Sequence, residues 1–277
     1  MSMTTETISL PECETLLLDL KGHALHVTLN RPKARNAMSL TMVQELLNVF
    51  QSIEDSLTIR ALVLRGSEGN FCAGGDIKDM AGARAAGMSN ADSDPFYELN
   101  LAFGKMLIVA NKIPQVLIVV TEGAVLGGGF GLACISDVAL SASSAKFGLP
   151  ETGLGIPPAQ IAPFVVSRIG LTQARRLALL GARFKGQEAL ALGIVHEAHD
   201  ESEALEEALE RTLKQVERCA PQANRVTKNL ILSVGNEPLE DLLDHAAHSF
   251  SKAVNGAEGQ EGTMAFIQKR VPSWCSE

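Results

Sequence analysis

Residues 123–133 read GAVLGGGFGLA and follow an apolar stretch, residues 115–120, that is typical of a buried strand. A second glycine-rich turn, FCAGGDIK at residues 71–78, follows the apolar stretch 61–65. Such turns can lead a strand into the first turn of a helix, where backbone N–H groups have no partner within the helix and the helix dipole is positive. Because glycine lets a ligand approach the backbone, either turn could bind phosphate or stabilise an oxyanion; tight packing without a ligand is the alternative.

Outward from these turns, the first 200 residues alternate between strand-like and helix-like patterns. Residues 15–20 and 24–30 are rich in Leu, Val and Thr, and Lys21-Gly22-His23 between them predicts a hairpin turn. Residues 40–56 repeat apolar side chains at helical spacing, with Ser39 as the expected N-cap. Together with a further strand at 138–142, this alternation predicts an α/β fold with a largely parallel sheet.

Beyond about residue 200 the pattern becomes entirely helical. Residues 200–203, DESE, are typical of a capping box at a helix start, and apolar side chains then recur at helical spacing from Leu205 to Val216. We therefore predict two parts, an α/β core over residues 1–200 and a helical C-terminal segment over residues 201–277. Residues 81–94 are small and polar, and we interpret them as a mobile loop or a poorly anchored helix. This segment could serve as a lid or be a surface insertion.

The overall composition excludes several classes of protein. With 24 basic and 32 acidic residues, the formal net charge is −8, which argues against a nucleic-acid-binding protein. No apolar run reaches the roughly 18 residues that a membrane span needs. Five cysteines without a C-x-x-C pair, and an N-terminus without the features of a secretory signal, indicate a cytoplasmic location.

Glu151 is the candidate acid–base residue. It lies between Pro150 and a mostly apolar stretch rich in glycine and proline, residues 152–158. An apolar environment raises the pKa of a carboxyl group, as a proton shuttle working near neutral pH requires. A glutamate on an ordinary polar turn is the alternative interpretation of this segment.

Taken in order, these segments resemble the crotonase superfamily of enoyl-CoA hydratases and isomerases over nearly the whole chain. Any one motif is weak evidence, but their order along the sequence is specific. The matching motifs are LNRPxxxNA from Leu29, FCAGGDIK from Phe71, GGG from Gly127, AKFGxPE from Ala145, GQEA from Gly186, GIV from Gly193 and FxxKR from Phe266.

The resemblance implies a spiral of ββα units with a helical C-terminal trimerisation segment, assembled as a homotrimer or as a hexamer built from two trimers. The substrate would be an acyl-CoA thioester, so coenzyme A would be part of the substrate and neither a separate cofactor nor a metal is expected. The backbone N–H groups of Gly75 and Gly128 would form an oxyanion hole, with Glu151 as the acid–base residue. Substrate-binding residues are expected at Lys33, Ala34, Arg35, Ala73, Asp76, Ile77, Lys78, Gly127, Gly131, Phe266 and Lys269.

One departure from the family pattern bears on the reaction. Many hydratases of the family carry a second glutamate where this chain has Gly131. With one carboxylate, Glu151 could pass the proton of water to Cα, it could move a proton between C2 and C4 as an isomerase does, or another group could position the water. The missing side chain would also free volume that suits a branched acyl chain.

Residues 129–137 and 154–163 resemble the isohexenylglutaconyl-CoA hydratases of acyclic terpene degradation. We therefore expect syn hydration of a β-branched enoyl-CoA of that type. The alternatives are an enoyl-CoA Δ3-Δ2 isomerase with Glu151 as its single proton shuttle, or a methylglutaconyl-CoA or short-chain enoyl-CoA hydratase.

Other functions have weaker support. The turn at residues 127–131 lacks the G-x-G-x-x-G pattern of dinucleotide binding and the Gly-Lys-Ser/Thr end of a P-loop. Residues His196 and His199, and His245 and His248, have spacings that a metal could use on a helix. No G-x-S-x-G nucleophile elbow is present. Thioester hydrolysis through a covalent Glu151 anhydride and a non-catalytic scaffold remain as alternatives.

Overall fold

The computed structural model describes residues 9–76 and 94–275, and its core is a six-stranded sheet. Strand β1 (Leu16–Lys21) pairs antiparallel with β2 (Ala24–Leu29) through a tight turn in which Gly22 has φ +56°. All other neighbours in this sheet run parallel, in the order β2, β3, β4, β6 and β9. The remaining strands are β3 (Ala61–Gly66), β4 (Val116–Thr121), β6 (Val138–Ala142) and β9 (Glu197–His199). The hairpin and the parallel sheet are as predicted.

A smaller sheet holds the strands that lie between these in the sequence. Strand β7 (Lys146–Gly148) pairs with both β5 (Ala124–Leu126) and β8 (Arg183–Lys185). The chain therefore passes from the large sheet to the small one and back, from β4 to β5, then to β6, and then to β7. This alternation is the spiral of repeating units that the family resemblance implies, and it places both glycine-rich turns between the two sheets.

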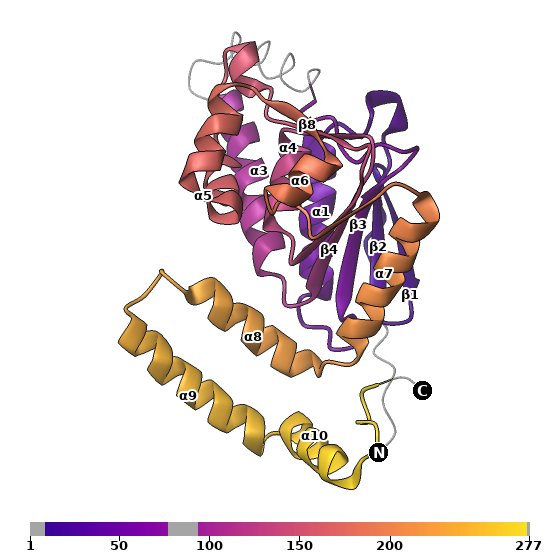
Figure 1. Cartoon of the computed structure of the whole chain (residues 1–277), viewed down its shortest axis with the longest axis vertical. Helices are drawn as coiled ribbons and strands as arrows, with labels where there is room; N and C mark the ends of the chain where they lie inside the picture. Colours follow the sequence, from indigo (N-terminus) through magenta and orange to yellow (C-terminus); the bar gives the residue numbers. More distant parts are fainter. Residues whose placement is uncertain (1–8, 77–93, 276–277) are drawn as a thin grey trace.

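Opposite faces of the large sheet are covered by different helices (Figure 1). On β3, Leu62 and Leu64 point into the larger apolar core, whereas Ala61 and Val63 point to the other face, as the two-residue period of a strand requires. The helices packed on the larger core are α1 (Leu40–Ile53), α3 (Pro95–Lys112), α4 (Gly128–Ile135), α5 (Ala162–Leu179) and α6 (Gly186–Ala191).

Helix α7 (Ser202–Glu217) covers the other face of the sheet. Its apolar stripe, which includes Leu205 and Leu209, packs on Val63 and Ile118. The secondary structure becomes helical near residue 200, as predicted, but the packing boundary lies after α7, so a division at residue 200 separates this helix from its own core. The expected capping box is also wrong, because the N-cap is Glu201 and no side chain caps it.

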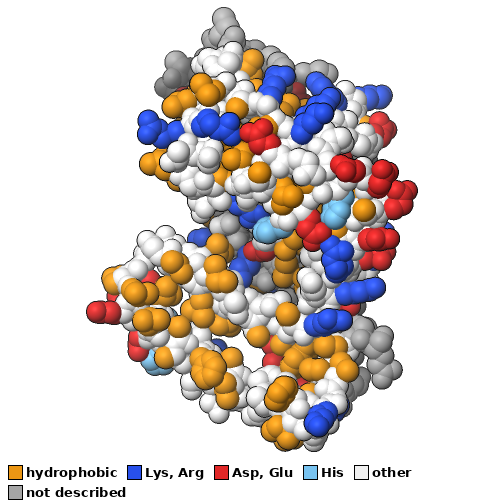
Figure 2. Space-filling view, viewed as in Figure 1, with side chains coloured by type: hydrophobic (Ala, Val, Ile, Leu, Met, Phe, Trp, Pro, Cys, Tyr) orange, Lys and Arg blue, Asp and Glu red, His pale blue; other side chains and the backbone are white. Residues whose placement is uncertain are grey.

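The last three helices form an arm below the core in Figure 1. They are α8 (Pro221–Ser233), α9 (Leu239–Asn255) and α10 (Ala257–Gln268). Helix α8 has no buried residue, and it is held by polar bonds: Lys228 Nζ donates to Asp137 Oδ2 (2.6 Å), and Arg225 donates to the carbonyl of Glu54 (2.8 Å). Hydrophobic side chains gather on the surface of this arm (Figure 2). No helix in the described ranges is long and apolar enough to cross a membrane.

Candidate active site

The two glycine-rich turns lie side by side because their backbones pair. Cys72 N–H donates to the carbonyl of Ala124 (2.8 Å), and Leu126 N–H donates back to the carbonyl of Cys72 (2.9 Å). On its other side, the first turn pairs with Met38, whose N–H donates to the carbonyl of Gly74 (2.8 Å) and whose carbonyl accepts from Asp76 N–H (2.9 Å). Gly75 is therefore held next to the start of α4.

Two backbone donors in these turns are free. Within the described parts of the chain, no hydrogen bond uses the N–H of Gly75 or that of Gly128. Gly128 is the first residue of α4, so its N–H has no acceptor inside the helix. Gly127 before it has φ +49° and ψ −112°, a backbone conformation that only glycine adopts readily. Two unpaired donors from adjacent turns, one at a helix N-terminus, are suited to stabilise negative charge on an oxygen atom.

Glu151 lies against the second turn. It begins the short 3-10 helix η2 (Glu151–Leu154), directly after β7 and Pro150. A Cβ built on Gly127 would lie 2.7 Å from Oε1 of Glu151 and 3.5 Å from Cα of Gly74. The other carboxylate oxygen, Oε2, is buried without a hydrogen-bond partner among the described residues. Burial raises the pKa of Glu151, and a bond from its own backbone N–H offsets this only in part.

An aromatic cluster fixes strand β7, which precedes Glu151 in the chain. Phe147 on β7 stacks on Phe184 of β8 with ring centroids 5.8 Å apart, and Phe130 of α4 meets both rings edge-on. Because Phe130 belongs to the helix that begins at Gly128, this cluster ties the segment before Glu151 and the N–H of Gly128 to the same core.

A groove of about 620 Å³ opens beside Gly75, where coenzyme A is expected. Within it, the guanidinium of Arg31 pairs with the buried carboxylate of Asp76 at 2.6 Å. The residues that line it are Asn30, Arg31, Pro32, Lys33, Ala34, Arg35, Ala37, Ala73, Gly75 and Asp76. Five of the predicted substrate-binding residues, Lys33, Ala34, Arg35, Ala73 and Asp76, thus line one groove, and Asp76 pairs with Arg31.

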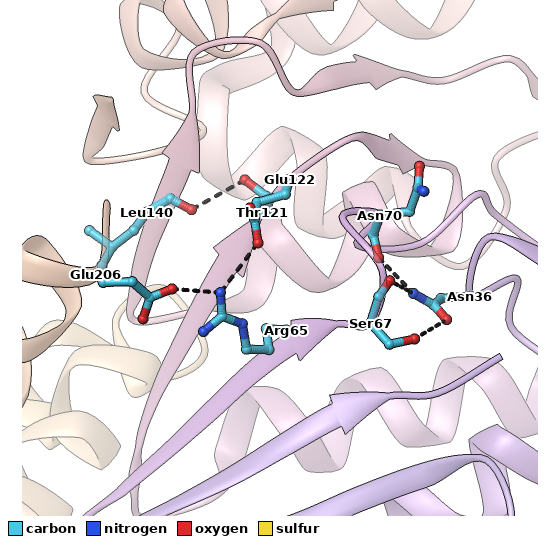
Figure 3. A network of polar contacts seen from close by, with 8 residues as sticks. All are labelled: Asn36, Arg65, Ser67, Asn70, Thr121, Glu122, Leu140 and Glu206. Atoms are coloured by element: carbon cyan, nitrogen blue, oxygen red, sulfur yellow. Dashed lines mark hydrogen bonds and ion pairs between the residues drawn. The ribbon is translucent and has the colours of Figure 1, made fainter. Parts of the chain in front are cut away.

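Asn36 shapes the edge of this groove. It is fully buried with φ +56°, and it follows the 3-10 helix η1 (Pro32–Ala34). Figure 3 shows its amide bonded to Ser67 and Asn70. The Nδ2 atom donates to the carbonyls of Ser67 (3.0 Å) and Asn70 (2.6 Å), and Oδ1 accepts from Arg31 N–H (2.8 Å). The asparagine of the LNRPxxxNA motif therefore has a structural role: it fixes the loop that carries Lys33 and Arg35.

Gly131 does not provide free space for a branched acyl chain. A Cβ built on it would collide with Cγ2 of Ile161 and would also lie 3.9 Å from Leu107 Cδ1. Ile161 is 3% exposed, at the end of the segment that links η2 to α5. The expected pocket volume is therefore filled by the side chain of Ile161, and Gly131 serves for close packing.

Phe266 and Lys269 lie away from the groove. Arg60, which precedes β3, donates to the carbonyl of Trp274, so the chain end after α10 packs where β3 begins. The groove instead lies beyond the other ends of β2 and β3. These two residues could reach a bound substrate only from another copy of the chain. Ile77 and Lys78, and the loop expected at residues 81–94 except for Asp94, lie outside the described residues.

The sequence analysis overlooked three residues near the site, all from α3 or the segment before α5. Phe103 of α3 faces the second glycine-rich turn, since a Cβ on Gly128 would lie 3.1 Å from Phe103 Cζ. Gln160 Nε2 donates to Oδ1 of Asn100, one turn before Phe103 (2.8 Å). The start of α3 did carry a signal, because Asp94-Pro95 is an N-cap followed by proline at the first helical position.

The histidine pairs belong to other contacts. His196 Nδ1 accepts from Ala139 N–H (3.0 Å), and His199 bonds Glu197 (3.0 Å). His245 contacts Glu237, and His248 contacts Asp244. Across residues 9–76 and 94–275, no three potential metal-binding side chains gather at one point.

Comparisons with known proteins agree with this geometry. A model of the family "Enoyl-CoA hydratase/isomerase" matches residues 20–277. A probable enoyl-CoA hydratase, echA8, of Mycobacterium bovis is 32% identical over 262 residues, which are 94% of this chain and 98% of that protein. Pseudomonas aeruginosa AtuE has a similar structure, with a TM-score of 0.92 and 60% identity over 95% of this chain and 100% of its own. An enoyl-CoA hydratase/isomerase from Marinobacter aquaeolei gives a TM-score of 0.93 at 57% identity, with 95% and 100% covered.

Proposed function

This chain belongs to the enoyl-CoA hydratase/isomerase family, and we propose that it hydrates a β-branched enoyl-CoA of the isohexenylglutaconyl-CoA type. Enoyl-CoA hydratase/isomerase-type activity follows from the family, and with it an acyl-CoA thioester as substrate. The observation that carries the proposed reaction is that the N–H groups of Gly75 and Gly128 and the Oε2 atom of Glu151 all lack a hydrogen-bond partner among the described residues.

The two donors act on the thioester carbonyl. Its oxygen accepts from Gly75 N–H and Gly128 N–H, which polarises the conjugated double bond toward attack at C3. The enolate that forms carries its charge on the same oxygen, so the donors stabilise the transition state more than the substrate. Loss of one such donor typically costs about 3–4 kcal/mol of transition-state stabilisation.

Glu151 carries out both proton transfers in the proposed mechanism. As a carboxylate, it takes a proton from water while the water oxygen bonds to C3. It then returns that proton to Cα of the enolate, which restores the thioester carbonyl. Because one carboxyl group serves both carbons, water and proton arrive on the same face of the double bond, and the addition is syn. The raised pKa of Glu151 suits a group that must accept and release a proton in one cycle.

The proposed acyl chain rests on sequence. The resemblance of residues 129–137 and 154–163 to isohexenylglutaconyl-CoA hydratases supports a β-branched, glutaconyl-type substrate. Because the side chain of Ile161 occupies the space next to Gly131, this position offers no volume for the branch of the acyl chain. The proposed substrate would have to place its branch elsewhere in the site.

An isomerase is the second candidate, and one observation favours it. Ile161 fills the position next to Gly131, which leaves Glu151 as the acid–base group of the described site. A single carboxylate is sufficient to move a proton between C2 and C4 without water.

We also propose that the reaction needs no cofactor beyond the coenzyme A of its substrate, and that the enzyme works in the cytoplasm as a homotrimer or a hexamer of two trimers. Exposed apolar side chains on the C-terminal helices, such as Phe250 and Phe266, support an assembled state.

The test is an assay in H₂¹⁸O with crotonyl-CoA and with a β-branched glutaconyl-type enoyl-CoA. We expect ¹⁸O at C3 of the product and faster turnover of the branched substrate. Glu151→Gln should lose this activity, because an amide cannot accept the proton of water. Migration of the double bond without ¹⁸O uptake would show an isomerase instead, and preference for crotonyl-CoA would refute the branched substrate.

A further inference from the structure

Two side-chain amides meet beside the oxyanion turn. Gln160 Nε2 donates to Oδ1 of Asn100 at 2.8 Å, which joins the segment after η2 to the first half of α3. Gln160 is seated directly on Gly104, where a Cβ would overlap its Oε1 atom. The neighbouring Ile161 packs against Gly131 of α4, where a Cβ would overlap its Cγ2 atom. The amide pair therefore has a fixed place on the two helices that flank the site.

The pair lies on the side of the site where the acyl chain must run. The groove expected to hold coenzyme A opens on the Gly75 side of the two free donors. The acyl chain of a thioester bound at those donors continues on the other side, past Gly128 and the ring of Phe103 that faces it. Asn100 lies one helical turn before Phe103 on the same face of α3, a rise of about 5 Å.

The amide pair can offer hydrogen-bond donors to a ligand, but its two oxygen atoms are already in contact with other groups. The oxygen of Asn100 accepts the bond from Gln160, and the oxygen of Gln160 is pressed against Gly104. The Nδ2 group of Asn100 makes no bond to another described residue, and Gln160 Nε2 keeps a second hydrogen. Asn100 is exposed and Gln160 is partly exposed, so these N–H groups are accessible to a ligand.

Groups that offer only donors match a partner that only accepts, and an ionised carboxylate is such a partner, whereas a hydroxyl group also carries a hydrogen to donate. We propose that Asn100 and Gln160 bind a carboxylate carried by the acyl chain of the substrate. This inference rests on the proposed function, in which the substrate is a glutaconyl-type thioester, and it assigns the recognition of that carboxylate to two named residues.

Binding of two unreactive thioesters tests the inference independently of turnover. Glutaryl-CoA and pentanoyl-CoA have acyl chains of five carbons and differ in the terminal carboxylate. We expect calorimetry to show that the wild-type protein binds glutaryl-CoA more tightly. Asn100→Leu and Gln160→Met should each reduce that preference roughly tenfold to a hundredfold, as expected for hydrogen bonds to a charged group. Asn100→Asp should reduce it further, because it places a like charge at the site.

A matched control exists on α1. Gln44 Nε2 donates to Asn48 Oδ1 at 3.0 Å, an exposed amide pair of the same kind outside the site. Asn48→Asp adds the same charge and should keep the wild-type preference.

Three outcomes would overturn the inference: no preference for glutaryl-CoA in the wild-type protein, an equal loss of affinity for both thioesters in the variants, or the same effect in Asn48→Asp. The proposed hydration is measured separately by ¹⁸O uptake. A protein that prefers glutaryl-CoA yet adds no water would contradict the proposed reaction and keep the carboxylate site.

Discussion

At the residue scale, the unpartnered oxygen of Glu151 has a consequence for stability. Burial raises the pKa of this carboxyl group above its ordinary value of 4.5, so the folded protein binds the proton more tightly than the unfolded chain does. The stabilising contribution is present below pH 4.5 and is lost as the pH rises through the raised pKa. The site therefore keeps its acid–base group at some cost in folding free energy near neutral pH.

The first prediction follows from the direction of this pKa shift. Glu151→Gln removes the titrating group, so the free energy of unfolding of the wild-type protein should fall relative to the variant as the pH rises from 4.5. Chemical denaturation of both proteins between pH 4 and 8 measures the difference. Activity should change in the opposite sense, because the carboxylate form is the base, and kcat/KM should rise through the same pH range. A pH-independent stability difference would contradict the raised pKa.

At the element scale, the segment between η2 and α5 is fixed because two of its side chains pack against glycines of α3 and α4. Residues 152–157 are exposed, whereas Ile161 is buried against Gly131. The backbone of the segment is tied to Glu151, since Ile156 N–H donates to its carbonyl at 3.1 Å. The contact of Ile161 with α4 thus helps to set the position of the acid–base residue.

The second prediction concerns that contact. Gly131→Glu alone should destabilise the protein by about 1–3 kcal/mol, because the new side chain collides with Ile161 in a packed core. In the double variant with Ile161→Ala, the collision is relieved, so the two changes should be non-additive. A double-mutant cycle of thermal and chemical unfolding measures the coupling, which we expect to be about 1 kcal/mol or more in favour of the pair. Additive effects would show that the two residues do not share this space.

The limits of sequence reasoning are clearest among these elements. Periodicity predicted β1, β2, α1, β3 and β4 to within one to three residues, because each buries one regular face. The motif order singled out the two glycine-rich turns and Glu151, which the structure places next to one another. The contacts of Gln160 with Gly104 and of Ile161 with Gly131 could not be predicted, because they join residues 56 and 30 positions apart and depend on helix packing. The same holds for α7, whose apolar stripe does not reveal which face of the sheet it covers.

At the scale of the whole molecule, helix α8 attaches the C-terminal arm to the core through hydrogen bonds and an ion pair, and many apolar side chains of the arm are exposed to solvent. Side chains on α9 and α10 that are large and hydrophobic remain exposed, including Phe250 at 72% and Phe266 at 85%. Contiguous exposed apolar surface of this kind marks an interface in proteins generally. The predicted substrate-binding roles of Phe266 and Lys269 require an assembly in which the last helices of one copy lie near the groove of another.

The third prediction is that Phe250→Glu disrupts this assembly. Burying a charge at an apolar interface is unfavourable, so the variant should shift toward the monomer mass of 29.5 kDa, whereas the wild-type protein should have three or six times that mass. Size-exclusion chromatography with light scattering measures both. Leu17→Glu, on the edge strand β1 with 54% exposure, is the matched control and should keep the wild-type mass. A monomeric wild-type protein would contradict the proposed assembly.

Both donors of the proposed oxyanion hole are main-chain groups, and this has a consequence for how such an enzyme can change through descent. Amino-acid replacement cannot delete a backbone N–H except by introducing proline, so the half of the chemistry that polarises the carbonyl is inherited with the path of the chain itself. In the proposed mechanism, replacements of Glu151 would instead change the proton transfers, and replacements of Asn100 or Gln160 would change the choice of acyl chain. Related proteins with this backbone would therefore keep the two N–H donors even when their substrate changes, or when hydration is replaced by double-bond migration.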